Sequence, residues 1–179
     1  MHTTTALPDS AITCIIRACT PDDIQSVNRI WNQGIVDRIA TLDTTAHTIQ
    51  QTTQYYNTHN TELYCIYVAV YDNTVVGFYS ISPYSHRVCY AHITSLTIYV
   101  DRSYRAHHIG TQLLLHAHHH CMTHNIKKII LSALSRNHVA MKWYERHGYR
   151  TVGSHIKQGI IDGQWCDTVI MEKLFGEQK

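Results

Sequence analysis

Histidine is the side chain that offers the most chemistry in this sequence, since 15 of its 179 residues are histidine. His116, His120 and His124 recur at four-residue spacing, which places them on one face of a helix. Imidazole nitrogens arranged in this way can bind a metal ion such as zinc. No cysteine or carboxylate completes a convincing ligand set around them, so we expect a polar helix face and no metal site.

A second chemically suggestive segment is the polar loop 101–108, which leads into a helix predicted to open at Ile109. Backbone N–H groups point outward at a helix N-terminus and the dipole is positive there, so anions bind at such ends. Arg105 adds positive charge, and the small Gly110 lets a ligand approach the backbone. Basic turns before helices are common, so the loop alone does not define a site.

Composition limits the class of protein to which these residues can belong. Hydrophobic residues make up 44% and charged residues 16%, as in a globular domain, and the net charge of +2 is too small to favour nucleic acid. No apolar run is long enough for a membrane span or an export signal, so a cytoplasmic location is expected. The cysteines are scattered without a C-x-x-C pair, which favours free buried thiols; they are Cys14, Cys19, Cys65, Cys89, Cys121 and Cys166.

The pattern of apolar residues predicts the elements that must position these groups. A strand over 12–19 precedes a helix with Thr20 as N-cap and Pro21 at its first position, and a second helix covers 45–59. Strands follow at 63–71, 75–82 and 90–100, then a helix from Ile109, a strand at 128–133 and a helix at 138–146 that ends before Gly148. Strands at 149–157 and 165–173 complete the chain. The order predicts one α/β domain over 12–175, a three-layer sandwich of one mixed sheet with helices on both faces, between tails at 1–11 and 176–179.

Two segments of this sequence resemble motifs of the GNAT superfamily of N-acetyltransferases. The segment from Tyr99 to Thr111 is similar to its strand, loop and helix N-terminus, with Arg105-x-x-His108-x-Gly110 in place of Arg/Gln-x-x-Gly-x-Gly/Ala. The segment from Asn137 to Tyr149 resembles the family pattern Asn-x-x-Ala-x-x-x-Tyr-x-x-x-Gly-Phe/Tyr. His108 replaces the first glycine of the loop, and a left-handed backbone at this position would be strained.

The resemblance implies acetyl-CoA as co-substrate, with its pyrophosphate at the loop and its pantetheine arm on Asn137. It also implies that Tyr144 is the general acid that protonates the departing thiolate. Ordinary helix packing is the alternative for Tyr144. The residues expected to bind acetyl-CoA are Ile98, Val100, Arg105, Ala106, His107, His108, Ile109, Gly110, Thr111, Asn137 and Tyr144.

Further segments are similar to the phosphinothricin and methionine-sulfoximine acetyltransferases, and this resemblance runs from about Ile15 to Met171. The segments are Asn32–Ile35, Ser82–Tyr84, Arg87, Tyr90, Tyr99–Val100 and Gly163–Asp167. Members of that group acetylate the α-amino group of small amino-acid-like compounds and are usually homodimers. The resemblance therefore implies a small amine substrate, a homodimer, and substrate contacts from Arg87, Tyr84, Tyr90 and Asp167.

One departure from that group concerns the general base. The group carries a Glu four residues before the Tyr-Val pair, where this sequence has Ser95. A serine hydroxyl cannot take a proton at neutral pH, although it can hold a water. His92 has a suitable pKa range, but a regular strand would place it on the opposite face from Ser95. Ser95 with a water, His92 and Asp167 are therefore the three candidates.

The function implied by these resemblances is direct acetyl transfer to an amine in a ternary complex, with Tyr144, Ser95 and His92 as the catalytic residues. Alternatives are acetylation of another amine (a protein N-terminus, a polyamine or an antibiotic) and a degenerate module that binds acyl-CoA without turnover. Asn137 and Tyr144 favour the enzyme, whereas Ser95 and His108 favour the module.

Overall fold

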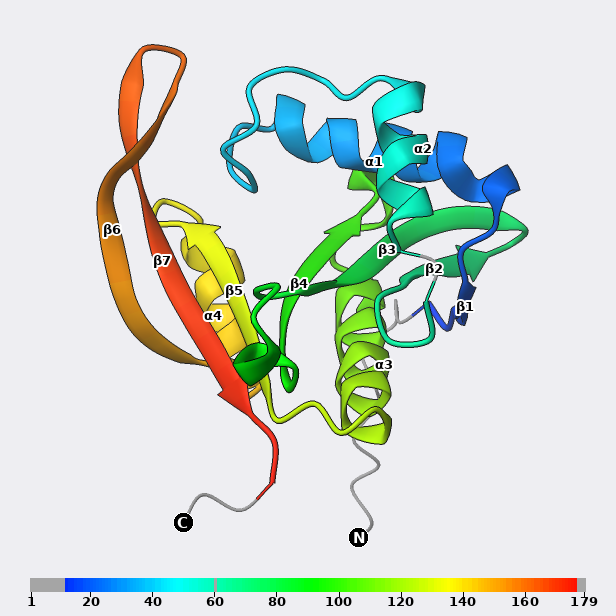
Figure 1. Cartoon of the computed structure of the whole chain (residues 1–179). Coiled ribbons are helices and arrows are strands. Elements are labelled where there is room, and N and C mark those ends of the chain that lie inside the picture. The colour runs from blue at the N-terminus through cyan, green and yellow to red at the C-terminus, as the bar shows by residue number, and fades with distance from the viewer. Residues whose placement is uncertain (1–11, 60, 177–179) are drawn as a thin grey trace, which may run out of the picture.

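The computed structural model describes residues 12–59 and 61–176, so the tail predicted at 1–11 and all but the first residue of the tail predicted at 176–179 lie outside the described residues. Seven strands form one mixed sheet in the order β1-β2-β3-β4-β5-β7-β6 (Figure 1). The elements are β1 (Ile15–Ala18), η1 (Pro21–Asp23), α1 (Ile24–Val36), α2 (Ile49–Asn57), β2 (Ile66–Tyr71), β3 (Thr74–Pro83), η2 (Val88–Tyr90), β4 (Ile93–Val100), η3 (Arg102–Tyr104), α3 (Ile109–Thr123), β5 (Lys128–Leu134), α4 (His138–Arg146), β6 (Arg150–Ile161) and β7 (Gln164–Leu174).

The helices divide between the two faces of the sheet, which confirms the predicted sandwich (Figure 1). On one face, α1 packs Val27, Ile30 and Trp31 against β2 and β3. On the other, α3 packs Leu113 and Leu114 into the larger core, which α4 joins through its own buried side chains. α1 and α3 therefore each present an apolar stripe to the sheet, as the three- and four-residue spacing predicted.

Local sequence signals set the starts and ends of several elements. Thr20 and Asp23 form the capping box that begins the first helical segment, with Pro21 at its first position. The hairpin between β2 and β3 turns at Asp72 and Asn73, both with positive φ, as a two-residue turn of this kind requires. Gly148 follows α4 with φ of +84°, where a residue without a Cβ avoids strain.

The ends of some predicted elements differ from those observed. The strand predicted to start at residue 90 starts at Ile93, because 88–90 forms the short η2 turn. The helix predicted over 45–59 is confined to Ile49–Asn57, since Thr48 caps it with its side chain. β6 extends to Ile161, beyond the predicted end at 157, because it pairs with β7 almost to the turn.

The parallel pair β4–β5 is the part of the sheet that creates room for a ligand. Its pairing covers only Ile93–Ser95 with Lys128–Ile130, although β4 continues to Val100 and β5 to Leu134. Beyond this short ladder the two strands diverge (Figure 1). The middle of the sheet is therefore split at the carboxyl ends of β4 and β5.

None of the helices in the described ranges is long and apolar enough to cross a membrane.

Candidate active site

A cavity of about 330 Å³ occupies the gap between β4 and β5. The loop between α1 and α2 covers it on one side, and α4 closes it on the other. The lining comes from five regions of the chain: Ala40, Thr41 and Leu42 of the loop; Leu96, Thr97, Ile98 and Tyr99 of β4; Leu131 to Leu134 of β5; Asn137, Ala140 and Tyr144 of α4 and its N-cap; and Thr168 of β7.

The backbone of β4 presents hydrogen-bonding groups to this cavity. Tyr84 N–H donates to Ile93 O, and Asp101 N–H donates to Val76 O. Because backbone groups alternate along an antiparallel strand, the odd-numbered residues of β4 bond to β3 and the even-numbered ones face β5. In the described chain β5 pairs with none of the residues after Ser95, so Ile98 directs its N–H and C=O into the gap. Val100 O accepts a hydrogen bond from Arg105 Nε at 3.3 Å.

The loop before α3 has a left-handed backbone at the position where His108 replaces the first glycine of the family pattern. His108 is the N-cap of α3 with φ of 61°, and Ala106 has φ of 67°. Two non-glycine residues thus occupy a region that costs roughly 1–2 kcal/mol each. A Cβ added to Gly110 would lie 3.5 Å from Trp143 Cζ2, an ordinary contact that leaves no room for a longer side chain.

The predicted phosphate-binding Arg105 is ion-paired with the end of α1. Its Nη1 lies 2.7 Å from Asp37 Oδ2, and Arg102 Nη2 lies 2.5 Å from Asp37 Oδ1. Ile109 is buried, whereas the Thr111 hydroxyl accepts a hydrogen bond from Trp143 Nε1 at 3.3 Å. Trp143 thereby joins the start of α3 to α4, which fixes the helix N-terminus beside the cavity.

Asn137 and Tyr144, the residues of the second motif that are expected to bind acetyl-CoA, both line the cavity. Asn137 caps α4, since its Oδ1 accepts a hydrogen bond from Ala140 N at 3.1 Å. Its amide nitrogen remains available as a donor. Burial raises the pKa of Tyr144, with the Tyr99 phenol adding to the shift, so the hydroxyl is protonated at neutral pH. No hydrogen-bond partner of this hydroxyl occurs in the described part of the chain.

The three candidate bases lie in different places. Ser95 is on the face of β4 that carries Tyr99, and it pairs with Ser82 of β3. His92 precedes β4, is exposed, and has Nδ1 3.1 Å from Asn125 O. Asp167 accepts a hydrogen bond from Lys157 N at 2.7 Å. None of the three is in the cavity wall.

The predicted substrate contacts of the β3–β4 connection form a group of their own. Arg87 is exposed beside η2, and the rings of Tyr84 and Tyr90 meet edge to face with centroids 5.5 Å apart. This connection leads into the paired end of β4, so these residues are absent from the cavity wall. Their role stays a prediction.

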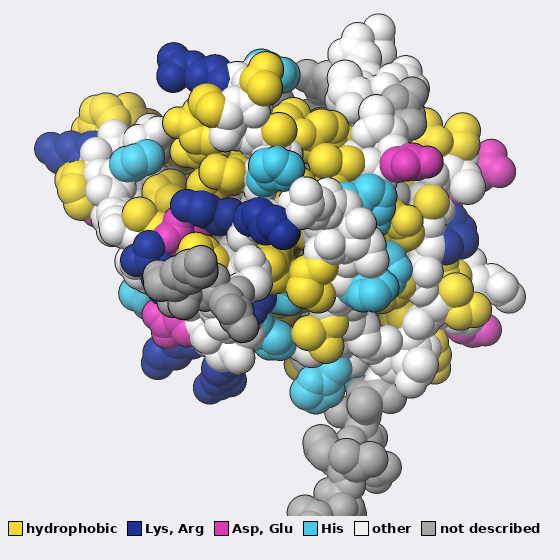
Figure 2. Space-filling view, turned by 60° about the horizontal axis from the view of Figure 1, so that its bottom comes forward, with side chains coloured by type: hydrophobic (Ala, Val, Ile, Leu, Met, Phe, Trp, Pro, Cys, Tyr) yellow, Lys and Arg dark blue, Asp and Glu magenta, His cyan; other side chains and the backbone are white. Residues whose placement is uncertain are grey.

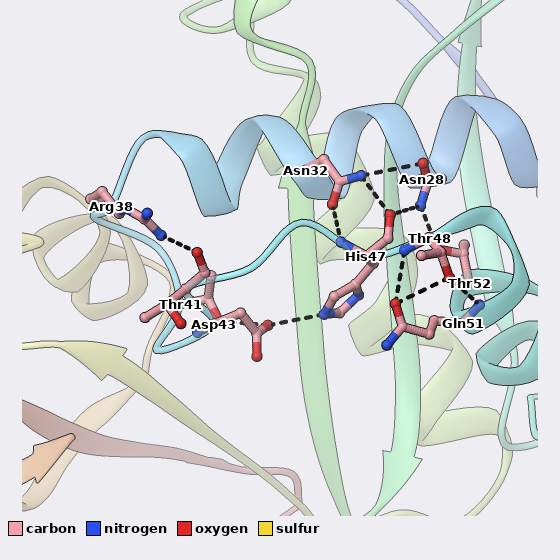
Figure 3. Close-up of polar contacts among 10 residues, drawn as sticks. Asn28, Asn32, Arg38, Thr41, Asp43, His47, Thr48, Gln51 and Thr52 are labelled. Atoms are coloured by element: carbon pink, nitrogen blue, oxygen red, sulfur yellow. Dashed lines mark hydrogen bonds and ion pairs between the residues drawn. The ribbon is translucent and has the colours of Figure 1, made fainter. Parts of the chain in front are cut away.

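The α1–α2 loop supplies a wall of the site that the sequence did not predict (Figure 3). Asn32 holds it by pairing with the backbone of His47, accepting from His47 N at 2.8 Å and donating to His47 O at 2.9 Å. Asn28 donates to the same carbonyl at 2.8 Å. At the cavity, Leu42 contacts Gly159 of β6, where an added Cβ would come within 2.9 Å. The only signal in the sequence was the similarity of Asn32–Ile35 to the phosphinothricin group.

His116 and His120 of α3 pack against β2 and β3. His120 Nε2 lies 3.3 Å from Cys65 Sγ, and His116 Nδ1 lies 2.8 Å from the Tyr79 hydroxyl. Figure 2 shows histidine side chains separated by other groups over the face turned forward there. Within residues 12–59 and 61–176, no three metal-binding side chains come together. All six cysteines are free thiols, of which Cys89 is exposed.

The divided sheet, the helix N-terminus and the tyrosine beside the gap are the features of an acetyltransferase. The profile of the Acetyltransferase (GNAT) family matches residues 33–149. The chain therefore belongs to the GNAT family of acetyltransferases.

Individual relatives extend this comparison. YwnH of Bacillus subtilis (strain 168), named for phosphinothricin acetyltransferase activity, is 26% identical over 157 residues, which are 87% of this chain and 96% of that protein. A crystal structure named for phosphinothricin N-acetyltransferase is 25% identical, with a TM-score of 0.88 over 92% of this chain and 100% of that chain. The phosphinothricin acetyltransferase of Sinorhizobium meliloti, solved with AcCoA, has a TM-score of 0.86 at 21% identity, over 92% and 90% of the two chains.

Proposed function

We propose that this protein transfers the acetyl group of acetyl-CoA to the amino group of a small amino-acid-like compound, of the phosphinothricin or methionine sulfoximine type. The carrying observation is the cavity between β4 and β5, which brings the free backbone of β4 together with Asn137 and Tyr144. Relatives named for phosphinothricin acetylation support the substrate class.

The residues around the cavity fit acetyl-CoA. The N-terminus of α3 and the loop from Arg105 would hold the pyrophosphate, and the Asn137 amide would contact the pantetheine arm. The thioester supplies the acetyl group and a thiolate leaving group. Ile98 N–H would donate to the carbonyl oxygen as negative charge develops on it. Tyr144, kept protonated by burial, would give its proton to the sulfur.

Attack requires the neutral form of the acceptor amine. For an α-amino group with a pKa near 8, about a tenth is neutral at pH 7. A positioned base is typically worth ~10²–10⁴-fold, so Ser95 would slow the reaction without abolishing it. The proposed reaction is direct attack of the amine on the thioester in a ternary complex, which needs no covalent intermediate on the protein.

Acetyl-CoA turnover measured by thiol release over a panel of amines tests this function. We expect phosphinothricin and methionine sulfoximine to be acetylated, with intersecting initial-rate lines for the two substrates. If a protein N-terminus, a polyamine or an antibiotic is acetylated in their place, the proposed substrate class is wrong. Tight acetyl-CoA binding without turnover on any amine would favour the non-catalytic module.

Arg87 is proposed to hold the α-carboxylate of the acceptor through a two-pronged hydrogen bond, on the resemblance of its segment to a substrate loop. Arg87→Ala should then raise the KM for methionine sulfoximine more than the KM for a simple amine. Equal effects on both acceptors would remove the role. Tyr84, Tyr90 and Asp167 belong to the same proposal.

We also propose that the protein is a cytoplasmic homodimer, as in the group it resembles. Free thiols suit a reducing compartment. β6 is an edge strand with apolar side chains such as Val152 and Ile156 more than half exposed, a surface that a second copy could cover. Light scattering of the purified protein measures the mass, and Ile156→Lys should shift a dimer through β6 toward the monomer.

A further inference from the structure

The α1–α2 loop carries a carboxylate to the edge of the cavity wall. Asp43 directly follows Leu42, and its Oδ2 accepts a hydrogen bond from the hydroxyl of Thr41 at 2.9 Å. Both Thr41 and Leu42 line the cavity. Tyr99, another wall residue, has its pKa raised by burial and further by the negative charge of Asp43. The carboxylate therefore lies next to the cavity wall although it is not itself part of the wall.

His47 lies near the same oxygen of this carboxylate as Thr41 does. Its Nε2 lies 3.6 Å from Asp43 Oδ2, and Figure 3 shows the two side chains pointing toward each other on the side of the loop away from α1. His47 is itself fixed through its backbone by Asn32 and through its ring by Trp31, with centroids 4.6 Å apart. Asp43 is thus placed by neighbours that are anchored to α1.

Asp43 differs from the other carboxylates of this region in its partners. Asp37 is paired with Arg102 and Arg105, Asp101 with Arg29, and Asp162 with Arg38. Among the described residues no lysine or arginine pairs with Asp43, and the basic side chain beside its carboxylate is His47. Its side chain is 44% exposed, so it is reachable from solvent. A carboxylate placed beside a cavity without a cationic side chain can pair with a cation from a ligand.

We propose that Asp43, oriented by Thr41 and His47, is the subsite that binds the protonated amino group of the acceptor. The inference rests on the proposed acetyltransferase function and adds the residue that selects cationic amines. Its chemistry is a charge-assisted hydrogen bond from an alkylammonium N–H to the Asp43 carboxylate. The subsite binds the protonated form of the acceptor amine, which is the abundant form at pH 7, beside the cavity. Ser95, which stands where the phosphinothricin group has Glu, has no carboxylate that could bind it.

The test uses Asp43→Asn in the full chain, because asparagine keeps the shape and can still accept the Thr41 hydrogen bond. At pH 7 the KM for an alkylammonium acceptor should rise about 10-fold, the lower end for a charged hydrogen bond at a partly exposed site. The KM for an aromatic amine with a pKa below 5, which is neutral at pH 7, should be unchanged. The KM for acetyl-CoA should stay the same. Asp72→Asn, at the exposed β2–β3 turn, is the control with the same change of net charge.

The pH dependence gives a second measurement that a purely structural role would leave unmoved. A nearby carboxylate stabilises the ammonium form, so it raises the pKa of the bound amine. In Asp43→Asn the kcat for the alkylammonium acceptor should therefore level off at a lower pH than in the native protein. His47 is the other titratable group beside Asp43, and His47→Gln should leave the selectivity for cationic amines largely in place.

Each outcome decides the inference. An equal rise of KM for charged and neutral amines, or no rise for either, would overturn the ammonium subsite while leaving the acetyltransferase intact. If no amine supports thiol release in the native protein, the proposed function fails and the subsite fails with it. Loss of folding in Asp43→Asn would be evident from its melting curve; Asp43→Glu, which keeps the charge, must then retain the preference for alkylammonium acceptors.

Discussion

Gly34 in α1 is the position where a single methyl group should disturb both the core and the cavity. A Cβ added there would lie 2.4 Å from Tyr99 Cε1 and 2.8 Å from Tyr99 Cδ1. Carbon atoms pack at about 3.5–4.0 Å, so the ring would have to move by about 1 Å. Phe78 stacks on the ring at 5.6 Å between centroids, and Trp31 lies against it at 6.3 Å, so little free space is available.

The expected cost of Gly34→Ala is a balance of two effects. Overpacking of a core typically costs about 1–3 kcal/mol. Alanine in a helix is favoured over glycine by about 1 kcal/mol, which offsets part of that. We expect a net loss of up to about 2 kcal/mol in the free energy of unfolding, or a fall in Tm of up to about 8 °C for a domain of this size. Because Tyr99 lines the cavity, the KM for acetyl-CoA should rise as well.

Thermal unfolding of a set of variants measures this effect. Gly153→Ala is the matched control, since nothing lies within 4 Å of its added Cβ, and its Tm should stay close to that of the native protein. In a Tyr99→Leu background the ring is gone, so Gly34→Ala should stabilise by up to about 1 kcal/mol. A native-background Gly34→Ala variant that melts at or above the native Tm would refute the reasoning.

Three further predictions concern the site and the acid stability. Tyr144→Phe should lower turnover about 100-fold with acetyl-CoA affinity nearly intact, and unchanged turnover would mean that another group protonates the thiolate. Gly110→Leu should weaken acetyl-CoA binding by calorimetry while Gly110→Ala, which fits beside Trp143, should not; an unaltered Kd for the leucine variant would remove the phosphate-loop assignment. The Lys128 ammonium, with Arg150, lowers the pKa of the buried Glu172 carboxyl. The ionised Glu172 therefore stabilises the fold fully above the unfolded pKa near 4.3, and this stabilisation is lost as pH falls through the lower folded pKa. In Glu172→Gln the free energy of unfolding, measured with urea, should therefore fall less steeply below about pH 5 than in the native protein. The same pH dependence in both proteins would contradict this.

The pH–rate profile of the native protein separates the candidate bases. If Ser95 only holds a water, log kcat/KM should rise with unit slope to the pKa of the free amine, without an earlier inflection. Ser95→Glu should then raise the rate at pH 7 and add such an inflection. An inflection in the native protein that disappears in His92→Gln or Asp167→Asn would assign the base to one of those residues, although neither lines the cavity wall.

The sequence by itself determined the elements and the two motif segments, because both depend on local periodicity and caps. The helices were predicted to begin at Ile109 and to span 138–146, and they do so, since an apolar stripe and a capping residue coincide at each. Asn137 caps α4 and Tyr144 lies within it, so the correct prediction of this one helix also predicted the relative positions of both residues. The left-handed backbone at His108 was foreseeable only as a consequence of the family pattern.

Tertiary structure alone decided which residues surround the cavity. The divergence of β4 and β5 after Ser95 depends on long-range pairing, which no local pattern encodes. Thr41, Leu42 and Asp43 reach the site because Asn32 ties His47, fifteen positions further along the chain, to α1. His92 and Ser95 are three residues apart, yet one lies outside β4 and the other within the sheet. The pleat and the strand ends separate side chains that are close in sequence, and packing brings together side chains that are far apart. The sequence therefore indicated the type of reaction, whereas the tertiary structure decided which residues surround the cavity.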